Sequence, residues 1–532
     1  MKEEGGMKKE EMLCEVTLGE VVCEFIDQSG PVTNGDFLYI DIGSIDRETK
    51  TILAPKPVPA SSAPSRAKQL LREGDVLVSM TRPNLNAVAI VGREFDNAIG
   101  STGFHVLRSK WMNQKFLYYL VQTSKFVDAM SEVVQGALYP AVRPKDISSF
   151  KFLLPSSLAQ RAIVAKLEEL LSDLDAGVAE LKAAQKKLAQ YRQSLLKAAV
   201  EGALTAEWRE KRKKDELRKQ KEAGTPFLPS SFDASALLQR ILAERRARWE
   251  AKQLAKFREQ GKTPPKDWQK KYPEPVQPDT SGLPELPEGW VWASLDMLGE
   301  IASGVAKGTK RDADVEVREV PYLRVANVQR GFLDLSEVKT ILATERDIAE
   351  LTLQAGDVLF NEGGDRDKLG RGWVWRDEVA NCIHQNHVFR MRPYLPEVLP
   401  ELISHHGNTF GKTWFQNAGK QTTNLASINM TMLRMFPVPL GPAEEQRELL
   451  NQLEVQIEHL DRQEQAVELG LKQSTAQRQN ILRAAFAGQL VPQDPNDEPA
   501  RVLLERIRAE RAEQAAMSKP RGRHQGGKDN PS

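Results

Sequence analysis

The chain has 532 residues and carries 74 Lys and Arg against 73 Asp and Glu, with 40% of its residues hydrophobic. This length predicts several domains, and the near-zero formal charge excludes a polycationic nucleic-acid coat while allowing local basic faces. No apolar run approaches the roughly 20 residues that a membrane span requires, so a membrane protein is excluded. The N-terminus lacks the apolar core of a signal peptide, and the only cysteines, Cys14, Cys23 and Cys382, fit a reducing compartment. We therefore expect a cytoplasmic protein without disulfides.

In chain order, the sequence predicts two globular parts, each followed by a long helix. After a disordered stretch at 1–12, short strand patterns and glycine-rich turns indicate a first domain at 13–155, and an uninterrupted helical pattern follows at 156–205. A basic linker with a helical insert is expected at 206–282, with helical pieces at 206–222 and 234–258. A second domain is expected at 283–440 and a second long helix at 441–490. The C-terminal segment 491–532 should hold a short helix and a disordered tail.

The basic linker accounts for most of the uneven charge. Residues 206–275 hold 19 Lys and Arg against 11 Asp and Glu, so the rest of the chain is net acidic. Prolines cluster near 263–265 and 273–278, and proline combined with dense charge is typical of a linker.

Matches at a period near 285 residues indicate that one unit has been duplicated. The tetrapeptide Gly-Asp-Val-Leu occurs at 74–77 and again at 356–359, and Leu196–Leu204 resembles Leu482–Leu490. A further echo pairs a leucine-rich stretch at 237–245 with one at 503–511. Several matches in the same order, at slightly drifting offsets, predict two similar domains of the α+β class. The period is too long for the common solenoid repeats.

Both long helices carry leucines at seven-residue spacing, which is typical of a coiled coil. The predicted seam is Leu167, Leu174, Leu181, Leu188 and Leu195 in the first helix and Leu453, Leu460, Val467 and Ile481 in the second. The two helices match in length and pattern, so we expect them to pair within one chain as an antiparallel coiled coil with pseudo-two-fold symmetry. Two separate coiled coils between different chains are the alternative.

Motifs for catalysis, nucleotides or metals are weak throughout. The Gly-Lys-Thr runs at 261–263 and 411–413 lack the upstream glycine of a phosphate-binding loop. The Cys and His residues at 382–387 lack the paired ligands of a closed zinc site. Glu337-Val-Lys339 with Asp314 mimics a nuclease triplet, which arises readily by chance in a chain with 28% charged residues. We therefore expect no catalytic residue, no metal site and no cofactor bound by this chain.

Motifs at the ends of the helices resemble one known family. The stretches Pro155–Leu167 and Leu196–Arg209 look like the first spacer of the specificity subunit of Type I restriction–modification enzymes. Leu283–Trp292 resembles the usual start of that family's recognition domains, and Pro439–Arg447 with Gly488–Asp497 resembles the second spacer and its exit. The resemblance covers about 13–515, but the first copy lacks the Pro-Glu-Gly-Trp start and the basic insert is unusually long.

The resemblance implies that each domain is a target-recognition domain that reads one half of a split double-stranded DNA target. It also implies that the coiled coil fixes the gap between the halves and docks two DNA-methyltransferase subunits. S-adenosylmethionine, ATP and Mg²⁺ would then act on the methyltransferase and on the restriction motor-nuclease subunits, and this chain would be no enzyme. The rival interpretations are a coiled-coil scaffold with two protein-binding heads and a standalone nuclease.

Loop residues are the candidates for DNA contact, because strands supply the scaffold. Arg and Lys suit guanine edges or phosphates, Asn and Gln suit adenine, and roughly a third of the candidates should touch DNA, mostly its phosphates. In the first domain the candidates are Arg82, Asn84, Asn86, Tyr139, Arg143 and Lys145. In the second domain they are Lys307, Lys310, Arg311, Arg366, Lys368, Arg371, Lys420, Gln421 and Asn424.

Overall fold

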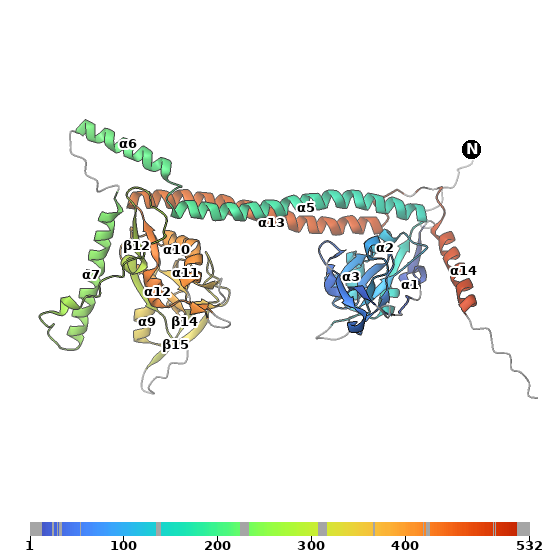
Figure 1. The fold of residues 1–532 in the computed structure, drawn as a ribbon, viewed down its shortest axis with the longest axis horizontal. Coiled ribbons are helices and arrows are strands. Elements are labelled where there is room, and N and C mark those ends of the chain that lie inside the picture. The colour runs from blue at the N-terminus through green and yellow to red at the C-terminus, as the bar shows by residue number, and fades with distance from the viewer. Residues whose placement is uncertain are drawn as a thin grey trace, which may run out of the picture. The chain divides into compact units, whose positions relative to one another are not determined.

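The structure is a computed structural model that describes residues 13–518, except 24–25, 29, 31–34, 54, 135–139, 224–232, 307–315, 365–367, 419, 422–425, 493 and 495. It divides into two compact units. Unit 1 comprises the chain up to Ala183 together with the chain from Val467, and unit 2 comprises Ala184–Ala466. Two long helices, α5 (Ser157–Val200) and α13 (Ala443–Phe486), each continue from one unit into the other (Figure 1).

The globular part of unit 1 is built from small sheets and short helices. Its largest sheet has the strand order β5-β2-β9-β6, and a three-stranded sheet has the order β10-β7-β8. The elements are β1 (Cys14–Thr17), α1 (Leu18–Val21), β2 (Asp36–Ile40), β3 (Ile45–Asp46), β4 (Thr51–Ile52), β5 (Lys56–Pro59), β6 (Ala67–Leu70), β7 (Val76–Ser79), β8 (Val88–Ile90), β9 (Ile99–Ser101), β10 (Phe104–Leu107), α2 (Gln114–Leu120), α3 (Ser124–Glu132), α4 (Pro144–Ser148) and β11 (Lys151–Leu154).

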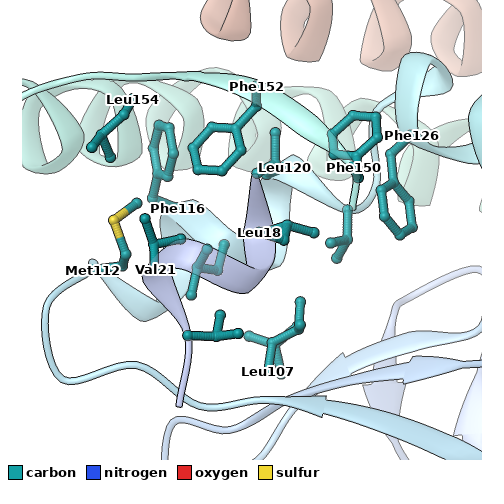
Figure 2. Packing of buried hydrophobic residues seen from close by; sticks show 14 of the residues in the cluster. Leu18, Val21, Leu107, Met112, Phe116, Leu120, Phe126, Phe150, Phe152 and Leu154 are labelled. Atoms are coloured by element: carbon teal, nitrogen blue, oxygen red, sulfur yellow. The ribbon is translucent and has the colours of Figure 1, made fainter. Parts of the chain in front are cut away.

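The core of unit 1 lies where the first and last strands of the domain meet. Strand β1 pairs antiparallel with β11, so Cys14 lies opposite Leu154. Leu18, Phe116 and Phe152, the last of them on β11, belong to one buried cluster, and Figure 2 shows their side chains. The same core extends to buried side chains of α5 and α13, which attaches the domain to the helix pair.

The globular part of unit 2 repeats this plan with longer strands. Its sheets have the orders β13-β19-β16, β15-β14-β18 and β17-β21-β20, and β12 pairs with β22 as β1 does with β11. The elements are β12 (Val291–Ser294), α8 (Leu295–Leu298), β13 (Gly299–Ser303), β14 (Val317–Leu323), β15 (Lys339–Thr344), α9 (Glu345–Leu351), β16 (Val358–Asn361), β17 (Gly363–Gly364), β18 (Ile383–His384), β19 (Val388–Pro393), α10 (Pro400–Asn408), α11 (Phe410–Ala418), β20 (Lys420–Gln421), β21 (Ala426–Ser427), α12 (Met430–Met435) and β22 (Pro437–Leu440).

The duplicated Gly-Asp-Val-Leu segments occupy matching places in the two units. Asp75 accepts hydrogen bonds from Arg108 Nε at 2.7 Å and Nη2 at 2.6 Å. Asp357 accepts the same two bonds from Arg392, both at 2.7 Å. Both aspartates are 1% exposed, and bidentate arginine–carboxylate pairs of this kind are geometrically demanding. The predicted duplication of one α+β domain is therefore confirmed at the level of single side chains.

The two long helices run antiparallel within unit 1. Leu167 of α5 shares the buried core with Ile481 of α13. Further along α5, Leu181 lies against Gly470, where an added Cβ would meet Leu181 Cδ1 at 3.2 Å. The residue number on α13 falls as the number on α5 rises, so the predicted antiparallel pairing within one chain is confirmed.

Unit 2 contains the other half of the pair. There, Leu195 of α5 packs with Leu453 and Leu460 of α13, and Arg192 donates to Glu464 at 3.1 Å. Of the predicted seam residues in the two units, some are buried and others are half-buried. The buried ones are Leu167, Leu195, Leu453, Leu460 and Ile481, and the half-buried ones are Leu174, Leu181, Leu188 and Val467.

The basic segment after α5 differs from a simple linker. It holds α6 (Ala206–Ala223) and α7 (Ala234–Glu259), close to the two helical pieces expected there. Leu237 and Ile241 of α7 belong to the main core of unit 2, so this helix extends the globular part beyond the start expected at 283. The apolar stripe at the start of α7 is the reason, because it would otherwise be exposed to water.

The C-terminal helix α14 (Ala500–Ser518) has the corresponding position in unit 1. Its Leu503 and Ile507 lie in the main core of that unit. Arg511 donates to the carbonyl of Gly19 in α1 at 2.6 Å, as Arg245 of α7 donates to the carbonyl of Asp296 in α8 at 3.2 Å. The sequence echo between 237–245 and 503–511 thus reflects two equivalent docking helices.

Candidate nucleic-acid interface

Two loops that carry candidate residues meet in unit 1. Arg82 and Asn84 follow strand β7, and Arg143 and Lys145 lie at the start of α4. A β-bridge pairs Thr81 with Ala141, and the Arg82 N–H donates to the Pro140 carbonyl at 2.8 Å. The side chains of all four residues are exposed, so the fold gathers them at one surface of the domain.

The turn after β7 has an unusual backbone. Arg82 has φ +49° and Asn86 has φ +44°, on either side of the short 3-10 helix η3 (Pro83–Leu85). Asn tolerates this left-handed region better than most residues, whereas Arg does not favour it. Non-glycine residues in this region concentrate at functional sites, where the surrounding structure enforces the conformation.

Not every candidate in these loops is available for DNA. The Asn86 amide nitrogen donates to the Val121 carbonyl at 3.2 Å, so this side chain holds the turn in place. The Arg143 guanidinium bonds the Asp146 carboxylate through Nε and Nη2, both at 3.2 Å, and it lowers the pKa of that carboxyl. Arg82, Asn84 and Lys145 are therefore the more accessible candidates.

Sequence reasoning missed Lys50, which lies beside the same turn. Its Nζ donates to the Asn86 carbonyl at 2.5 Å, and burial, together with the positive charge of Arg478, lowers its pKa to about 8. Lys50 and Asn84 line a cavity of about 290 Å³. Lys50 belongs to an ordinary polar turn, so no pattern in the sequence distinguishes it from other surface lysines.

The matching loops of unit 2 meet in the same way. Strands β17 and β20 both pair with β21, so the loop after β17, which contains Lys368 and Arg371, and the hairpin that begins at Lys420 both extend from one small sheet. Arg371 Nη2 donates to the Val325 carbonyl at 3.1 Å. Six candidates lie outside the described residues and have no structural account: Tyr139, Lys307, Lys310, Arg311, Arg366 and Asn424.

The two loop junctions are equivalent parts of the duplicated fold. In unit 1 the Val142 N–H donates to the Met80 carbonyl at 2.8 Å. In unit 2 the Ile428 N–H donates to the Glu362 carbonyl, also at 2.8 Å. The two carbonyls are 282 residues apart and the two N–H donors 286 residues apart, which are the offsets of the Gly-Asp-Val-Leu match and of the match between Leu196–Leu204 and Leu482–Leu490. Each copy therefore brings the same two loops together through an equivalent backbone hydrogen bond.

The described residues that were weighed as metal or nuclease sites have structural roles, and Asp314 lies outside the described residues. The His384 ring bonds the Val388 carbonyl at 2.6 Å, and burial lowers its pKa to about 4. Burial also raises the pKa of Cys382 to about 12. Glu337 bonds Arg324 at 3.2 Å on the surface. Within the described ranges, no group of three or more His, Cys, Asp or Glu side chains could hold a metal ion.

A buried carboxylate joins the spacer motifs in unit 2. Glu445 Oε1 accepts hydrogen bonds from Thr205 Oγ1 at 2.7 Å and from Arg209 Nη2 at 2.6 Å. Its Oε2 accepts from the indole N–H of Trp290 at 3.0 Å. We call these four residues the Glu445 cluster. The cluster joins three of the motif stretches, 196–209, 283–292 and 439–447, and the first copy has Ala159 where the second has Glu445.

A groove of about 1010 Å³ lies between the helix halves and the globular part of unit 2. Trp292, Trp373 and Phe410 line one side, and Glu454 and Glu458 of α13 line the other. Aromatic residues are enriched in protein–protein interfaces, so this groove has the composition of a partner-binding surface.

Comparison with known proteins agrees with this architecture. Residues 16–184 match the family described as the Type I restriction modification DNA specificity domain. The Type I restriction enzyme EcoDI specificity subunit of Escherichia coli is 24% identical over 77% of this chain and 79% of its own length. The EcoKI specificity subunit of Escherichia coli K12 is 22% identical over 84% of this chain and 83% of its own length.

A solved structure shares this fold. A chain from a study of complex assembly and conformational transition of the type I R-M system aligns with a TM-score of 0.63 at 22% identity. The alignment covers 90% of this chain and 98% of the other. None of the helices in the described ranges has the length and apolarity that a membrane crossing requires. With its duplicated domain and its paired long helices, the chain is similar over most of its length to specificity subunits of Type I restriction–modification enzymes.

Proposed function

We propose that this chain is the DNA-recognition subunit of a Type I restriction–modification complex and that each globular domain reads one half of a bipartite target. The observation that carries the proposal is the equivalent loop junction in the two units. The loops that form each junction contain Arg, Lys, Asn or Gln in their sequence, residue types that suit guanine edges, adenine edges or phosphates. The alternative, a scaffold that binds proteins, does not account for the same pair of polar loops in both domains.

The accessible candidates have distinct expected roles. Arg82 and Lys145 carry long cationic side chains that reach phosphates or a guanine edge, and Asn84 has the paired donor and acceptor that suit adenine. Lys368, Lys420 and Gln421 would act in the second half-site. Lys50 would stabilise the turn that presents Asn84, since it bonds the backbone of that turn.

The helix pair is proposed to set the gap between the half-sites and to dock two methyltransferase subunits. Each long helix has 44 residues, which corresponds to about 66 Å at about 1.5 Å per residue. Two copies of one surface can bind two identical partners equivalently. The groove beside Trp292 and Glu458 is a suitable contact for one of these partners.

The chemistry is proposed to lie on the partner subunits. S-adenosylmethionine would bind the methyltransferase subunits, and ATP and Mg²⁺ would act on the restriction motor-nuclease subunits. We expect the purified chain alone to transfer no methyl group from S-adenosylmethionine and to leave DNA uncut in Mg²⁺. Either activity in the isolated chain would contradict this assignment.

Mapping of methylated adenines tests the reading of half-sites. DNA from cells that carry the complex should show a bipartite motif that disappears when this chain is deleted. Combining Arg82→Ala with Asn84→Ala should relax the preference at one half-site and leave the other unchanged. The control Lys151→Ala removes an exposed lysine on β11, paired with Glu15, and should leave both half-sites intact. Equal loss at both half-sites would contradict the one-domain, one-half assignment.

A second experiment tests the helix pair as the determinant of the gap. Deleting Lys182–Leu188 and Glu468–Ser474 removes one heptad from each helix and keeps both seams in phase. The pair should shorten by about 10 Å, which is about three base pairs at about 3.4 Å each. Competition binding on targets with varied gaps, with methyltransferase subunits present, should show a shorter preferred gap. An unchanged gap in a folded variant would mean that the helices do not set the spacing.

A further inference from the structure

The segment that follows the docking part of α7 forms a hairpin with a strongly basic end. Helix α7 ends at Glu259, and the chain returns through a loop and the short 3-10 helix η6 (Trp268–Lys271). Residues 256–271 contain six Lys and Arg against two acids. We call the six residues the basic tip: Lys256, Arg258, Lys262, Lys266, Lys270 and Lys271.

An aromatic cluster holds this hairpin in a defined conformation. Trp249 of α7 stacks on Trp268 of η6 with ring centroids 5.7 Å apart and an interplanar angle of 19°. Tyr272 packs edge-on against Trp249 at 5.4 Å, and Phe257 packs against Trp268 at 6.2 Å. Offset and edge-on aromatic pairs of this kind are favourable contacts. The basic tip is therefore presented on an ordered support.

The base of the hairpin is anchored to the globular part of unit 2. Arg245 is 8% exposed and donates through Nη2 to the Asp296 carboxylate at 3.2 Å. Its Nη1 donates to the Tyr272 hydroxyl at 2.5 Å and to the Pro273 carbonyl at 2.8 Å. These bonds tie both arms of the hairpin to α8, so the hairpin is a fixed projection of the second domain.

The charges of the basic tip are exposed and largely uncompensated. All six side chains are exposed. Within the described part of the chain, these six side chains make one ion pair, between Lys270 and Asp267 at 2.9 Å. By contrast, the basic residues nearer the base of α7 have carboxylate partners, such as Arg240 with Glu397. Unpaired cations held close together repel one another, so their concentration here indicates an anionic partner.

We propose that the basic tip contacts the phosphate backbone of duplex DNA, outside the loops that read bases. Protein interfaces need apolar residues at their centre, but the aromatic residues of this hairpin pack on one another and leave mainly lysine and arginine outward. Long cationic side chains suit the regular phosphate array of a duplex, which needs no individual pocket. The contact would add affinity without sequence preference. This inference rests on the proposed function in that DNA is the ligand, but it concerns a separate surface.

The test measures binding of the full chain to a 60-base-pair duplex of random sequence at several KCl concentrations. Each phosphate contact contributes about 0.9 to the slope of log K against log salt. Combining Lys262→Gln, Lys266→Gln, Lys270→Gln and Lys271→Gln should lower the slope by about 2 to 3.6 and weaken binding at least tenfold at 100 mM KCl. The control Lys186→Gln with Lys187→Gln neutralises two exposed lysines of α5 and should leave the slope within about 0.5 of wild type.

The outcomes separate the two proposals. If wild type shows no salt-dependent affinity for the duplex, both the proposed function and this inference fail. If wild type binds but the tip variant has an unchanged salt slope, only the inference fails. The same holds if the decrease in slope for each lysine replaced is no larger in the tip variant than in the control. Stronger competition by polyglutamate than by duplex would assign the tip to an acidic protein and overturn the inference. The substitutions are on exposed side chains, and circular dichroism verifies that the variants are folded.

Discussion

Replacing Glu445 by alanine removes the acceptor of four hydrogen bonds at once. The carboxylate is 2% exposed and receives bonds from Thr205, from Arg209 through two nitrogens, and from the Trp290 indole. In the Glu445→Ala variant these donors would have no acceptor in the cluster. We therefore expect the junction of α5, α6 and β12 to lose more stability than any single surface contact provides.

The magnitude follows from the burial of the partners. Removing one member of a buried ion pair costs about 3–5 kcal/mol, because the other charge remains buried and unpaired. The Arg209 side chain is 18% exposed and can regain some hydration, which favours the lower end of that range. A loss of about 3 kcal/mol corresponds to a change of about a hundredfold in a local opening equilibrium. Glu445→Gln preserves the shape but removes the charge, so its effect should be intermediate.

Native-state hydrogen exchange measures this effect locally, which matters because a chain with two units need not unfold in one step. In Glu445→Ala, peptides covering 199–209 and 287–294 should exchange about a hundredfold faster than in wild type. The neighbouring Glu444 is the matched control, since its side chain is 53% exposed and pairs with Arg212 on the surface. Glu444→Ala should change exchange little, because exposed pairs contribute about 0–1 kcal/mol. Equal exchange in the two variants would refute the role assigned to the cluster.

Three further outcomes are expected. Leu460→Lys should destabilise unit 2 by about 3 kcal/mol or more, because it places a charge in the buried seam. The control Leu469→Lys on the same helix should have little effect, since Leu469 is 56% exposed. Equal denaturation midpoints of the two variants would contradict the assignment of Leu460 to the seam. Leu174→Lys should have an intermediate effect in unit 1, because Leu174 is half-buried, and hydrogen exchange of α5 would measure it. The free energy of unfolding should fall as the pH falls from about 6.5 to about 4. In this range the histidines of the unfolded chain become protonated, whereas the buried histidines of the folded chain stay neutral. These histidines, whose pKa burial lowers to about 4, are His105, His384, His405 and His406. Urea unfolding at several pH values tests this, and a flat profile across that window would contradict it.

The order of the domains and long helices could be predicted from the sequence, because heptad spacing and a long internal repeat both indicate them. The heptad leucines specify two long helices, and matched offsets around Asp75 and Asp357 specify a duplicated domain. The docking of α7 was not predicted, because dense charge and proline masked the apolar stripe formed by Ala234, Leu237 and Ile241. The echo between 237–245 and 503–511 held the missing signal, since both stretches place Leu and Ile against equivalent cores.

The candidate site could be predicted only as a set of loops. Sequence reasoning selects polar side chains in turns, but it does not show which of them bond the protein itself. Asn86 donates to Val121 and Arg371 donates to Val325, so both stabilise backbone in this structure. Lys50 was missed because its position beside Asn84 depends on contacts between segments far apart in the chain. Such contacts are set by packing, and no local pattern records them.

The docking of α14 has a consequence for how the protein is made. The core beneath β1 and β11 includes Leu503 and Ile507, which follow Leu154 by about 350 residues. At about 5–20 residues per second, a ribosome needs tens of seconds to produce that interval. The N-terminal domain therefore leaves the ribosome with an apolar face that its own segment cannot cover, and it waits in that state while the second domain is synthesised. The domain translated first is the one completed last, so chaperone dependence should concentrate at the beginning of the nascent chain.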